Sequence, residues 1–360
     1  MVTEATKPPV FLVGAPRSGT TMLAAMLASH PAISVGPETQ FFSKLPLEDL
    51  EQAARAEEWP HAATSLLMSL TLADQSVAEL FETSQSEISS FLADRERSIT
   101  AMLESLTLPF AAKRSKQRWA EKTPNHIQNL ETIRQLWPAA PIIRIIRDAR
   151  DVGLSTRKLP TFSDHVLPNI YVWQQWNGGA EDFLDNDPLS LTIRYEDLVD
   201  MPQEVLKQVC ELIGEEFDPA MIEFGTAARD VSSDNEGWKK QVSASLTSSR
   251  KYAWKRDLPQ EIRDVCDLVC HELLVKHGYE SGPEPTRTFH AFRMSREYIE
   301  QQEGALIKAA RSGRRWLPTL DTARADRIVD QPQYSRFRNP ALLAKLGLGR
   351  ISSLIERILA

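Results

Sequence analysis

The feature of this sequence that most limits its fold is an apolar run that ends in a glycine-rich loop. Residues 10–21 read VFLVGAPRSGTT, and an apolar helical pattern, MLAAMLASH, follows at once. A buried strand that leads through a tight turn into a helix N-terminus directs several backbone N–H groups at one place, where they bind anions well. The segment therefore predicts a phosphate or sulfate site after the first strand of an α/β fold.

The loop departs from the nucleotide-triphosphatase pattern at one position. Residues 14–21 have the G-x-x-x-x-G-K-[ST] spacing, but Thr20 takes the place of the lysine and Arg17 supplies a positive charge earlier in the loop. In kinases and triphosphatases that lysine neutralises the β- and γ-phosphates during transfer. Its absence weakens the hypothesis of a P-loop kinase. The loop alone leaves open a simple turn that packs a helix on a sheet.

The body of the chain alternates strand-like and helix-like segments. Strands are expected over residues 32–35, 118–122, 141–147 and 189–195. Helices are expected over residues 124–137, 148–158, 170–183, 202–213, 219–228 and 259–277. Short links between alternating strands and helices predict a P-loop-like parallel β-sheet flanked by helices, in one α/β domain over about residues 8–280.

Two further expectations concern individual helices. Apolar residues spaced by threes and fours over about residues 45–110 predict a helical insertion, which could shape an acceptor pocket or serve as plain scaffold. Thr123 is expected to cap the helix that begins at Pro124, a position where the missing N–H has no cost.

Residues 281–360 form a basic extension that is expected to be helical. They carry 14 Lys and Arg against 8 Asp and Glu, whereas the whole chain has a net charge of -7. The apolar pattern from Leu342 to Leu359 is typical of an amphipathic helix. Such a helix could contact a membrane surface or a second subunit, as in a homodimer, or pack on its own domain. The acidic body argues against nucleic acid as a partner.

The sequence favours a cytoplasmic protein without a metal site. The first ten residues, MVTEATKPPV, lack the charged-then-apolar pattern of a signal peptide. No apolar stretch approaches the about 20 residues that span a bilayer. Three cysteines are too few for a disulfide framework. Cys266, Cys270 and His271 supply only three of the four ligands that a structural zinc site needs.

Two motifs resemble those of the 3′-phosphoadenylyl-sulfate (PAPS) dependent sulfotransferases. Residues 16–21, PRSGTT, are similar to the family's loop for the 5′-phosphosulfate, and residues 36–39, GPET, are similar to a stretch of the protein-tyrosine sulfotransferases and their bacterial relatives. The resemblance implies PAPS as co-substrate, 3′,5′-ADP as product, no required metal, and a hydroxyl acceptor on a small molecule or glycan, such as a sugar, alcohol or phenol. The residues that it places on the phosphosulfate are Arg17, Ser18, Gly19, Thr20 and Thr21.

A second phosphate site is expected where Arg147 ends a strand and Ser155 follows two helical turns later. An arginine fork and a hydroxyl both bind phosphate well, and the resemblance implies that these two hold the 3′-phosphate of PAPS. Tyr195 is similar to the family's aromatic residue beside the adenine, with a plain core position as the alternative. Arg250 and Lys251 resemble a late loop that closes over the cofactor phosphates.

Sulfuryl transfer needs a base for the acceptor hydroxyl, cations for the sulfuryl oxygens and a donor for the leaving phosphate oxygen. The resemblance implies Glu38 as the base, Lys122 as that donor and Arg17 as the cation. His126 is the rival base, because small-molecule sulfotransferases use a histidine shortly after the corresponding lysine. The sequence thus favours a sulfotransferase that acts by in-line transfer. A nucleotide-binding interaction protein without catalysis and a P-loop kinase are the alternatives.

Overall fold

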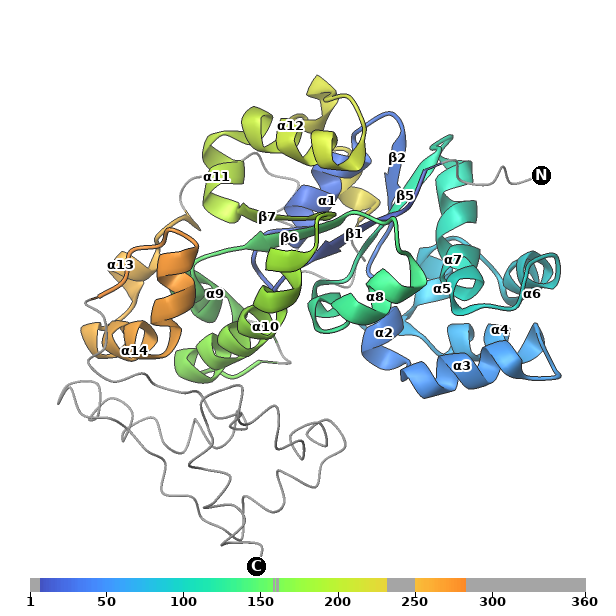
Figure 1. Cartoon of the computed structure of the whole chain (residues 1–360), viewed down its shortest axis with the longest axis horizontal. Helices are drawn as coiled ribbons and strands as arrows, with labels where there is room; N and C mark the ends of the chain where they lie inside the picture. Colours follow the sequence, from blue (N-terminus) through green and yellow to red (C-terminus); the bar gives the residue numbers. More distant parts are fainter. Residues whose placement is uncertain (1–6, 158, 160–161, 232–249, 283–360) are drawn as a thin grey trace, which may run out of the picture.

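The fold is built on a parallel sheet in which the glycine-rich loop follows the central strand. The computed structural model describes residues 7–157, 159, 162–231 and 250–282. Five parallel strands lie in the order β2-β5-β1-β6-β7 (Figure 1). Their bounds are β1 Val10–Val13, β2 Ile33–Val35, β5 Arg118–Lys122, β6 Ile142–Ile146 and β7 Ser190–Arg194. The predicted α/β class and its strands are confirmed.

The apolar sequences of the central strands follow from burial on both faces. Every residue of β1 and β6 is buried. Strands covered by helices on both sides read as nearly continuous apolar runs, which is why both stand out in the sequence. The chain passes from β1 to β2 and β5 on one side of β1, and then crosses to β6 on the other side. Such a reversal leaves a crevice at the carboxyl ends of the strands, where ligands of open α/β sheets bind.

Helices cover the two faces of the sheet in separate groups (Figure 1). One face packs on α1, α11 and α12, which share an apolar cluster with alternate residues of β1. The opposite residues of β1 pack with helices that include α7, α8 and α10. The bounds of these helices are α1 Thr20–Ala28, α7 Ile99–Lys113, α8 Leu130–Leu136, α10 Val166–Asn186, α11 Tyr195–Asp200 and α12 Pro202–Ile213.

The expected insertion between β2 and β5 is helical, and it contains a small hairpin that the sequence did not predict. Its elements before α7 are α2 Phe41–Lys44, α3 Leu47–Arg55, α4 His61–Met68, β3 Thr71–Leu72, β4 Gln75–Ser76, α5 Val77–Leu80 and α6 Gln85–Ala93. The insertion shares one buried apolar cluster with the β1 residues Phe11 and Val13. It is therefore packed on the sheet rather than appended to it.

A third apolar cluster joins the segment after β6 to the end of the described chain. It contains residues of α9 Ala149–Thr156, α10, α13 Trp254–Asp257 and α14 Gln260–Lys276. Figure 1 shows α13 and α14 beside α9 and α10. This packing brings the late part of the chain to the end of β6, where Arg147 lies.

Two local predictions are wrong. The helix expected over 219–228 is a pair of short 3-10 turns, η2 Pro219–Met221 and η3 Ala227–Arg229, and the intervening Gly225 is a poor helix former. Thr123 does not cap the turn η1 Pro124–Gln128, because its hydroxyl donates instead to the buried Glu121.

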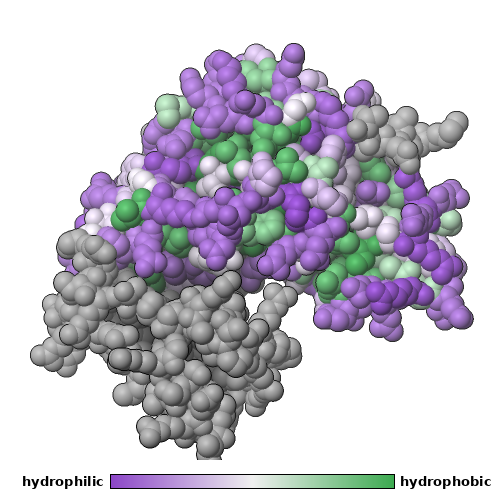
Figure 2. Space-filling view, in the orientation of Figure 1, coloured by the Kyte–Doolittle hydropathy of each residue, from purple (hydrophilic) through white to green (hydrophobic). Residues whose placement is uncertain are grey.

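The expectations for the C-terminal extension fall on residues that the structure does not describe. The basic extension from 283 onward lies outside the described residues, and so do its expected contacts with a membrane surface or a second subunit. Within the described part of the chain, no helix is both long enough and apolar enough to span a bilayer. Figure 2 shows mostly hydrophilic residues over the described part of the visible face.

Candidate active site

Two glycines of the glycine-rich loop pack closely against neighbouring residues. At Gly14, a Cβ would lie 2.5 Å from the carbonyl oxygen of Ile145 on the neighbouring strand β6. Gly19 has φ +105°, and a Cβ there would lie 2.6 Å from the ring of Tyr195. Only glycine adopts that backbone without strain and leaves room for the ring. The loop is thereby held between β6 and the ring of Tyr195, which the sequence analysis compared with an aromatic residue beside the adenine.

The loop leads into the N-terminus of helix α1. Gly19 precedes α1, and no side chain among the described residues caps the first turn of this helix. The first N–H groups of a helix have no partner within the helix, so those of Thr20 and Thr21 face the loop. The Oγ of Ser18 is buried and has no hydrogen-bond partner among the described residues. A buried orphan hydroxyl beside an uncapped helix end fits an anionic ligand.

Arg147 joins the loop to the second expected phosphate site. Its guanidinium donates to the carbonyl oxygens of Arg17 at 3.2 Å and of Arg250 at 2.6 Å, and it lies 4.5 Å from the ring centre of Tyr195. Arg17 in turn donates from Nε to the Oγ of Ser155 at 3.0 Å. The structure thus brings together residues that are far apart in the sequence. The buried Nε of Arg147 has no partner among the described residues.

Lys251 is the predicted site residue that the structure does not bring to this cluster. Its ammonium pairs with Asp200 at the end of α11. Arg250 reaches the cluster through its backbone carbonyl, which accepts from Arg147. The late loop therefore contributes main-chain contacts where the sequence suggested side-chain cations.

Asp151 holds the late loop in place, and the sequence analysis missed it. Its buried carboxylate accepts the N–H groups of Tyr252 at 2.8 Å and Trp254 at 2.9 Å, and it lies 3.5 Å from Arg147. Burial raises the pKa of Asp151, although Arg147 and the two N–H groups act against that shift. Its position in the first turn of α9, four residues after Arg147, was the signal that could have revealed it.

Glu38 and Lys122 form an ion pair next to the loop. Lys122 ends β5 and is fully buried, and its Nζ lies 2.9 Å from Oε1 of Glu38, which is 8% exposed. Oε2 of Glu38 accepts from the side-chain amide of Gln40 at 2.7 Å. The backbone N–H of Gly14 donates to the carbonyl oxygen of Pro124, so the chain after Lys122 contacts the loop directly. A carboxylate, an ammonium and an anion loop thus lie at the carboxyl ends of adjacent strands.

Both ring nitrogens of His126 are engaged in the protein interior. Nε2 accepts the backbone N–H of Phe42 at 3.2 Å, which requires an unprotonated Nε2. Nδ1 therefore carries the proton and donates to Oε2 of Glu121 at 2.8 Å. The side chain is completely buried. This geometry leaves the ring without a nitrogen for an acceptor hydroxyl and favours Glu38 as the base.

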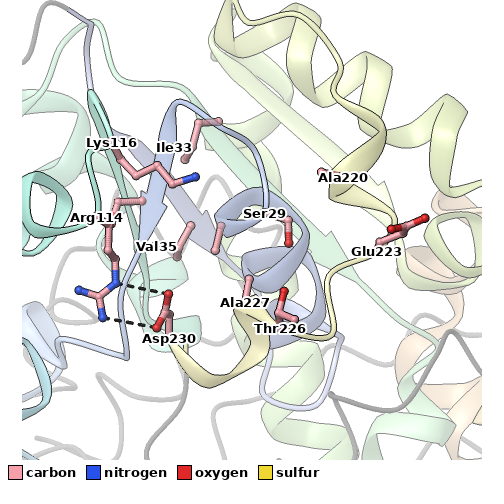
Figure 3. Close-up of a pocket in the computed structure, with 12 residues that line it drawn as sticks. Ser29, Ile33, Val35, Arg114, Lys116, Ala220, Glu223, Thr226, Ala227 and Asp230 are labelled. Carbon is pink, nitrogen blue, oxygen red and sulfur yellow. Dashed lines mark hydrogen bonds and ion pairs between the residues drawn. The ribbon is translucent and has the colours of Figure 1, made fainter.

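A separate hollow of about 540 Å³ lies away from these residues. Figure 3 shows its lining, from the C-terminal end of α1, β2 and the turn after α7 to η2 and η3, with Arg114 paired to Asp230. None of its lining residues was predicted for the site. Among the residues that the structure describes, no group of three or more His, Cys, Asp or Glu could hold a metal ion.

This α/β protein has a glycine-rich loop at the strand crossover, two arginines, Arg17 and Arg147, in contact there, and the Glu38–Lys122 pair nearby. Such a site is equipped to bind an anionic group and to act on it. Residues 8–219 match the model of the sulfotransferase family, which is more than half of the 360 residues. The chain belongs to the sulfotransferase family.

The relatives and solved structures agree with this assignment. The nodulation protein NoeE of Sinorhizobium fredii is 26% identical over 303 residues, which are 77% of this chain and 67% of that protein. Protein-tyrosine sulfotransferase A of Caenorhabditis elegans is 23% identical over 290 residues, covering 78% of this chain and 69% of that protein. The sulfotransferase domain of the Synechococcus PCC 7002 olefin synthase has a TM-score of 0.54 at 22% identity, covering 78% of this chain and 99% of that domain. This last likeness shows the shared fold.

Proposed function

We propose that this sulfotransferase moves a sulfuryl group from PAPS to a hydroxyl acceptor and releases 3′,5′-ADP. The observation that carries the proposal is the 2.9 Å pair of Glu38 and Lys122, which places a proton acceptor and a cation beside the anion loop. Family membership supplies the reaction class, and the geometry supplies residues for each task that the reaction sets.

The residues at the strand crossover fit the two phosphates of this co-substrate. Ser18 offers a buried hydroxyl to the 5′-phosphosulfate, next to the N–H groups of Thr20 and Thr21, and in the described part of the chain neither that hydroxyl nor the helix end has a side-chain partner. The N–H of Gly19 lies at the same helix end. Arg147 offers an Nε that has no hydrogen-bond partner among the described residues for the 3′-phosphate, and Ser155 lies close by through its contact with Arg17.

Two features of the site suit the adenine end. Tyr195 begins α11 directly after β7 and is stacked below the guanidinium of Arg147. The carbonyl oxygen of Arg250 accepts a hydrogen bond from the same guanidinium. An aromatic ring that is held against a phosphate-binding arginine fits a purine nucleotide. Lys251, paired with Asp200, would have to change partners to contribute a charge.

The proposal assigns one residue to each chemical task. When bound, PAPS supplies an electron-poor sulfuryl group on a phosphate leaving group. Glu38 takes the proton of the acceptor hydroxyl while that oxygen forms its bond to sulfur. Lys122 donates a hydrogen bond to the phosphate oxygen that departs as the old sulfur–oxygen bond breaks, and Arg17 provides positive charge for the sulfuryl oxygens. No step requires a metal ion.

The acceptor is proposed only as a class. The relatives include protein-tyrosine sulfotransferases, whose names specify a phenolic hydroxyl on a protein. A hydroxyl on a small molecule or glycan, such as a sugar, alcohol or phenol, meets the same requirement for a base at Glu38. A cytoplasmic location and a homodimer remain predictions from the sequence.

Thermal unfolding with nucleotides tests the co-substrate, and labelled transfer tests the reaction. We expect 3′,5′-ADP without Mg²⁺ to raise the Tm, and ³⁵S from labelled PAPS to appear on one class in a panel of phenols, alcohols and oligosaccharides. Stabilisation by ATP with Mg²⁺ but not by 3′,5′-ADP would contradict the proposal in favour of a kinase. Binding of 3′,5′-ADP without transfer to any acceptor would favour a nucleotide-binding interaction protein.

A further inference from the structure

Two chain segments meet at the carboxyl end of β5 through two separate side-chain contacts. Lys122 pairs with Glu38, whereas the preceding residue, Glu121, accepts from the hydroxyl of Thr39 at 2.7 Å. Successive side chains of a strand point to opposite sides of the sheet. The Glu121–Thr39 contact therefore lies on the opposite side of β5 from the Lys122–Glu38 pair, and it joins the residues next to that pair in the chain.

The carboxylate of Glu121 is saturated with donors. Oε1 accepts from the hydroxyls of Thr39 at 2.7 Å and Thr123 at 2.6 Å. Oε2 accepts from the backbone N–H of Thr123 at 3.1 Å and from Nδ1 of His126 at 2.8 Å. A carboxylate offers about four acceptor sites, so none remains. Burial acts to raise the pKa of Glu121, but the contacts with His126, Thr123 and Thr39 outweigh it and keep that pKa below its usual value.

The partners of Glu121 continue to the loop that carries Glu38. The hydroxyl of Thr123 accepts the backbone N–H of Gln40 at 3.2 Å, and Nε2 of His126 accepts the backbone N–H of Phe42 at 3.2 Å. Gln40 is held in the left-handed region at φ 55°, which is unfavourable for a residue with a side chain. From that position its amide donates to Oε2 of Glu38 at 2.7 Å.

We propose that Glu121 is a positioning residue for sulfuryl transfer, which acts through Thr39, Thr123 and His126 to fix the loop that presents Glu38 to the acceptor hydroxyl. The inference rests on the proposed role of Glu38. It assigns His126 to the support of the base, which accounts for a buried histidine with both nitrogens engaged. A buried polar network with every member satisfied is rigid, and rigidity is what a positioned base requires.

A threonine pair offers a matched test. Thr39→Val removes one donor to Glu121 and the hydroxyl that accepts the N–H of Phe41, with little change of shape, and Thr39→Ser keeps both contacts. Thr64→Val is the control, because the Oγ1 of the buried Thr64 has no hydrogen-bond partner among the described residues. Glu121→Gln should have the larger effect, because the side-chain NH₂ of the glutamine would face groups that donate hydrogen bonds to Glu121 in the wild type.

The first measurement needs no substrate. Amide hydrogen exchange of the ligand-free protein, followed by NMR, reports the N–H groups of Gln40 and Phe42. We expect both to exchange at least about tenfold faster in Thr39→Val and Glu121→Gln, and to be unchanged in Thr64→Val, because local opening sets the exchange rate. Unchanged protection of both amides in folded Thr39→Val and Glu121→Gln would overturn the inference.

The second measurement is the rate of transfer from PAPS to the acceptor found with the labelled panel. We expect Thr39→Val to lower kcat by about tenfold to a hundredfold, because small displacements of a catalytic group have effects of that size. The KM for PAPS should stay the same, and Thr39→Ser should recover most of the kcat. If Glu38→Gln is slow while Thr39→Val keeps the wild-type kcat, the positioning role alone is overturned. A wild-type rate in Glu38→Gln would instead overturn the proposed base, and the inference with it.

Discussion

Arg17 donates from Nε to the Oγ of Ser155 across 3.0 Å, although 138 residues separate the two in the chain. Arg147 donates to the carbonyl oxygen of the same Arg17. The loop after β1 and the segment after β6 are therefore linked by direct contacts, so the two proposed phosphate sites are adjacent.

Arg147→Ala should weaken binding of 3′,5′-ADP about tenfold to a hundredfold, because a hydrogen bond to a charged group contributes about 1.5–3 kcal/mol. Isothermal titration calorimetry measures the change. Adenosine 5′-monophosphate is the control ligand, since it lacks the 3′-phosphate and should lose little affinity. An equal loss for both nucleotides would contradict the assignment of Arg147 to the 3′-phosphate.

Gly19→Ala should lower the free energy of unfolding by about 1–3 kcal/mol and reduce nucleotide binding, because the new Cβ meets the ring of Tyr195 at a strained backbone position. The control is Gly179→Ala in α10, where a Cβ would have no described neighbour within 4 Å. That variant should gain about 0.5–1 kcal/mol, since alanine favours a helix over glycine. Urea unfolding of both variants checks the prediction, which a tolerated Gly19→Ala would refute.

Stability should fall in acid through Glu181, which bonds to His277 at 3.0 Å and to Arg144 on β6. Burial acts to raise the pKa of Glu181, but the hydrogen bonds from His277, Arg144 and Lys276 outweigh it and hold that pKa well below 4.5. A carboxyl with a lowered pKa in the folded state stabilises the protein above its unfolded pKa, and that stability is lost as the pH falls toward the folded pKa.

Urea unfolding between pH 7 and pH 3 measures this effect. The wild type should lose stability below about pH 4.5, and Glu181→Gln should be less stable at pH 7 with a flatter dependence on pH. The same slope in both proteins would show that other carboxylates govern the acid response.

The architecture could be predicted from the sequence because burial produces local patterns of apolar residues. The runs of β1 and β6 are apolar since both sheet faces are covered, and the loop needs Gly14 and Gly19 because a Cβ at either position would approach a neighbouring residue too closely. The structure brings together Arg17, Arg147 and Ser155, and it pairs Glu38 with Lys122. These groups follow strands or begin helices, so topology alone places them near one another.

The sequence could not predict hydrogen-bond and ion-pair partners where a side chain has several within reach. In the structure the ammonium of Lys251 pairs with Asp200, and Thr123 donates to Glu121 rather than capping a helix. The role of Asp151 could not be predicted, because its carboxylate accepts the N–H groups of Tyr252 and Trp254, about a hundred residues later in the chain. Such choices depend on which groups the fold brings close, and no local pattern records them.

The proposed base can be tested by one change of charge without a change of shape. Glu38→Gln keeps the side-chain size next to Lys122 and removes the ability to accept a proton, so turnover should fall about a hundredfold or more. Glu48→Gln, at an exposed position of α3, controls for the loss of one negative charge. His126→Asn tests the rival base, although its contacts with Glu121 and Phe42 give that variant a structural effect as well.

The decisive measurement is the single-turnover rate of ³⁵S transfer from PAPS in Glu38→Gln, together with its Kd for 3′,5′-ADP. We predict a rate at least about a hundredfold below that of the wild type and of Glu48→Gln, with an unchanged Kd. A wild-type rate of transfer in Glu38→Gln would contradict the account.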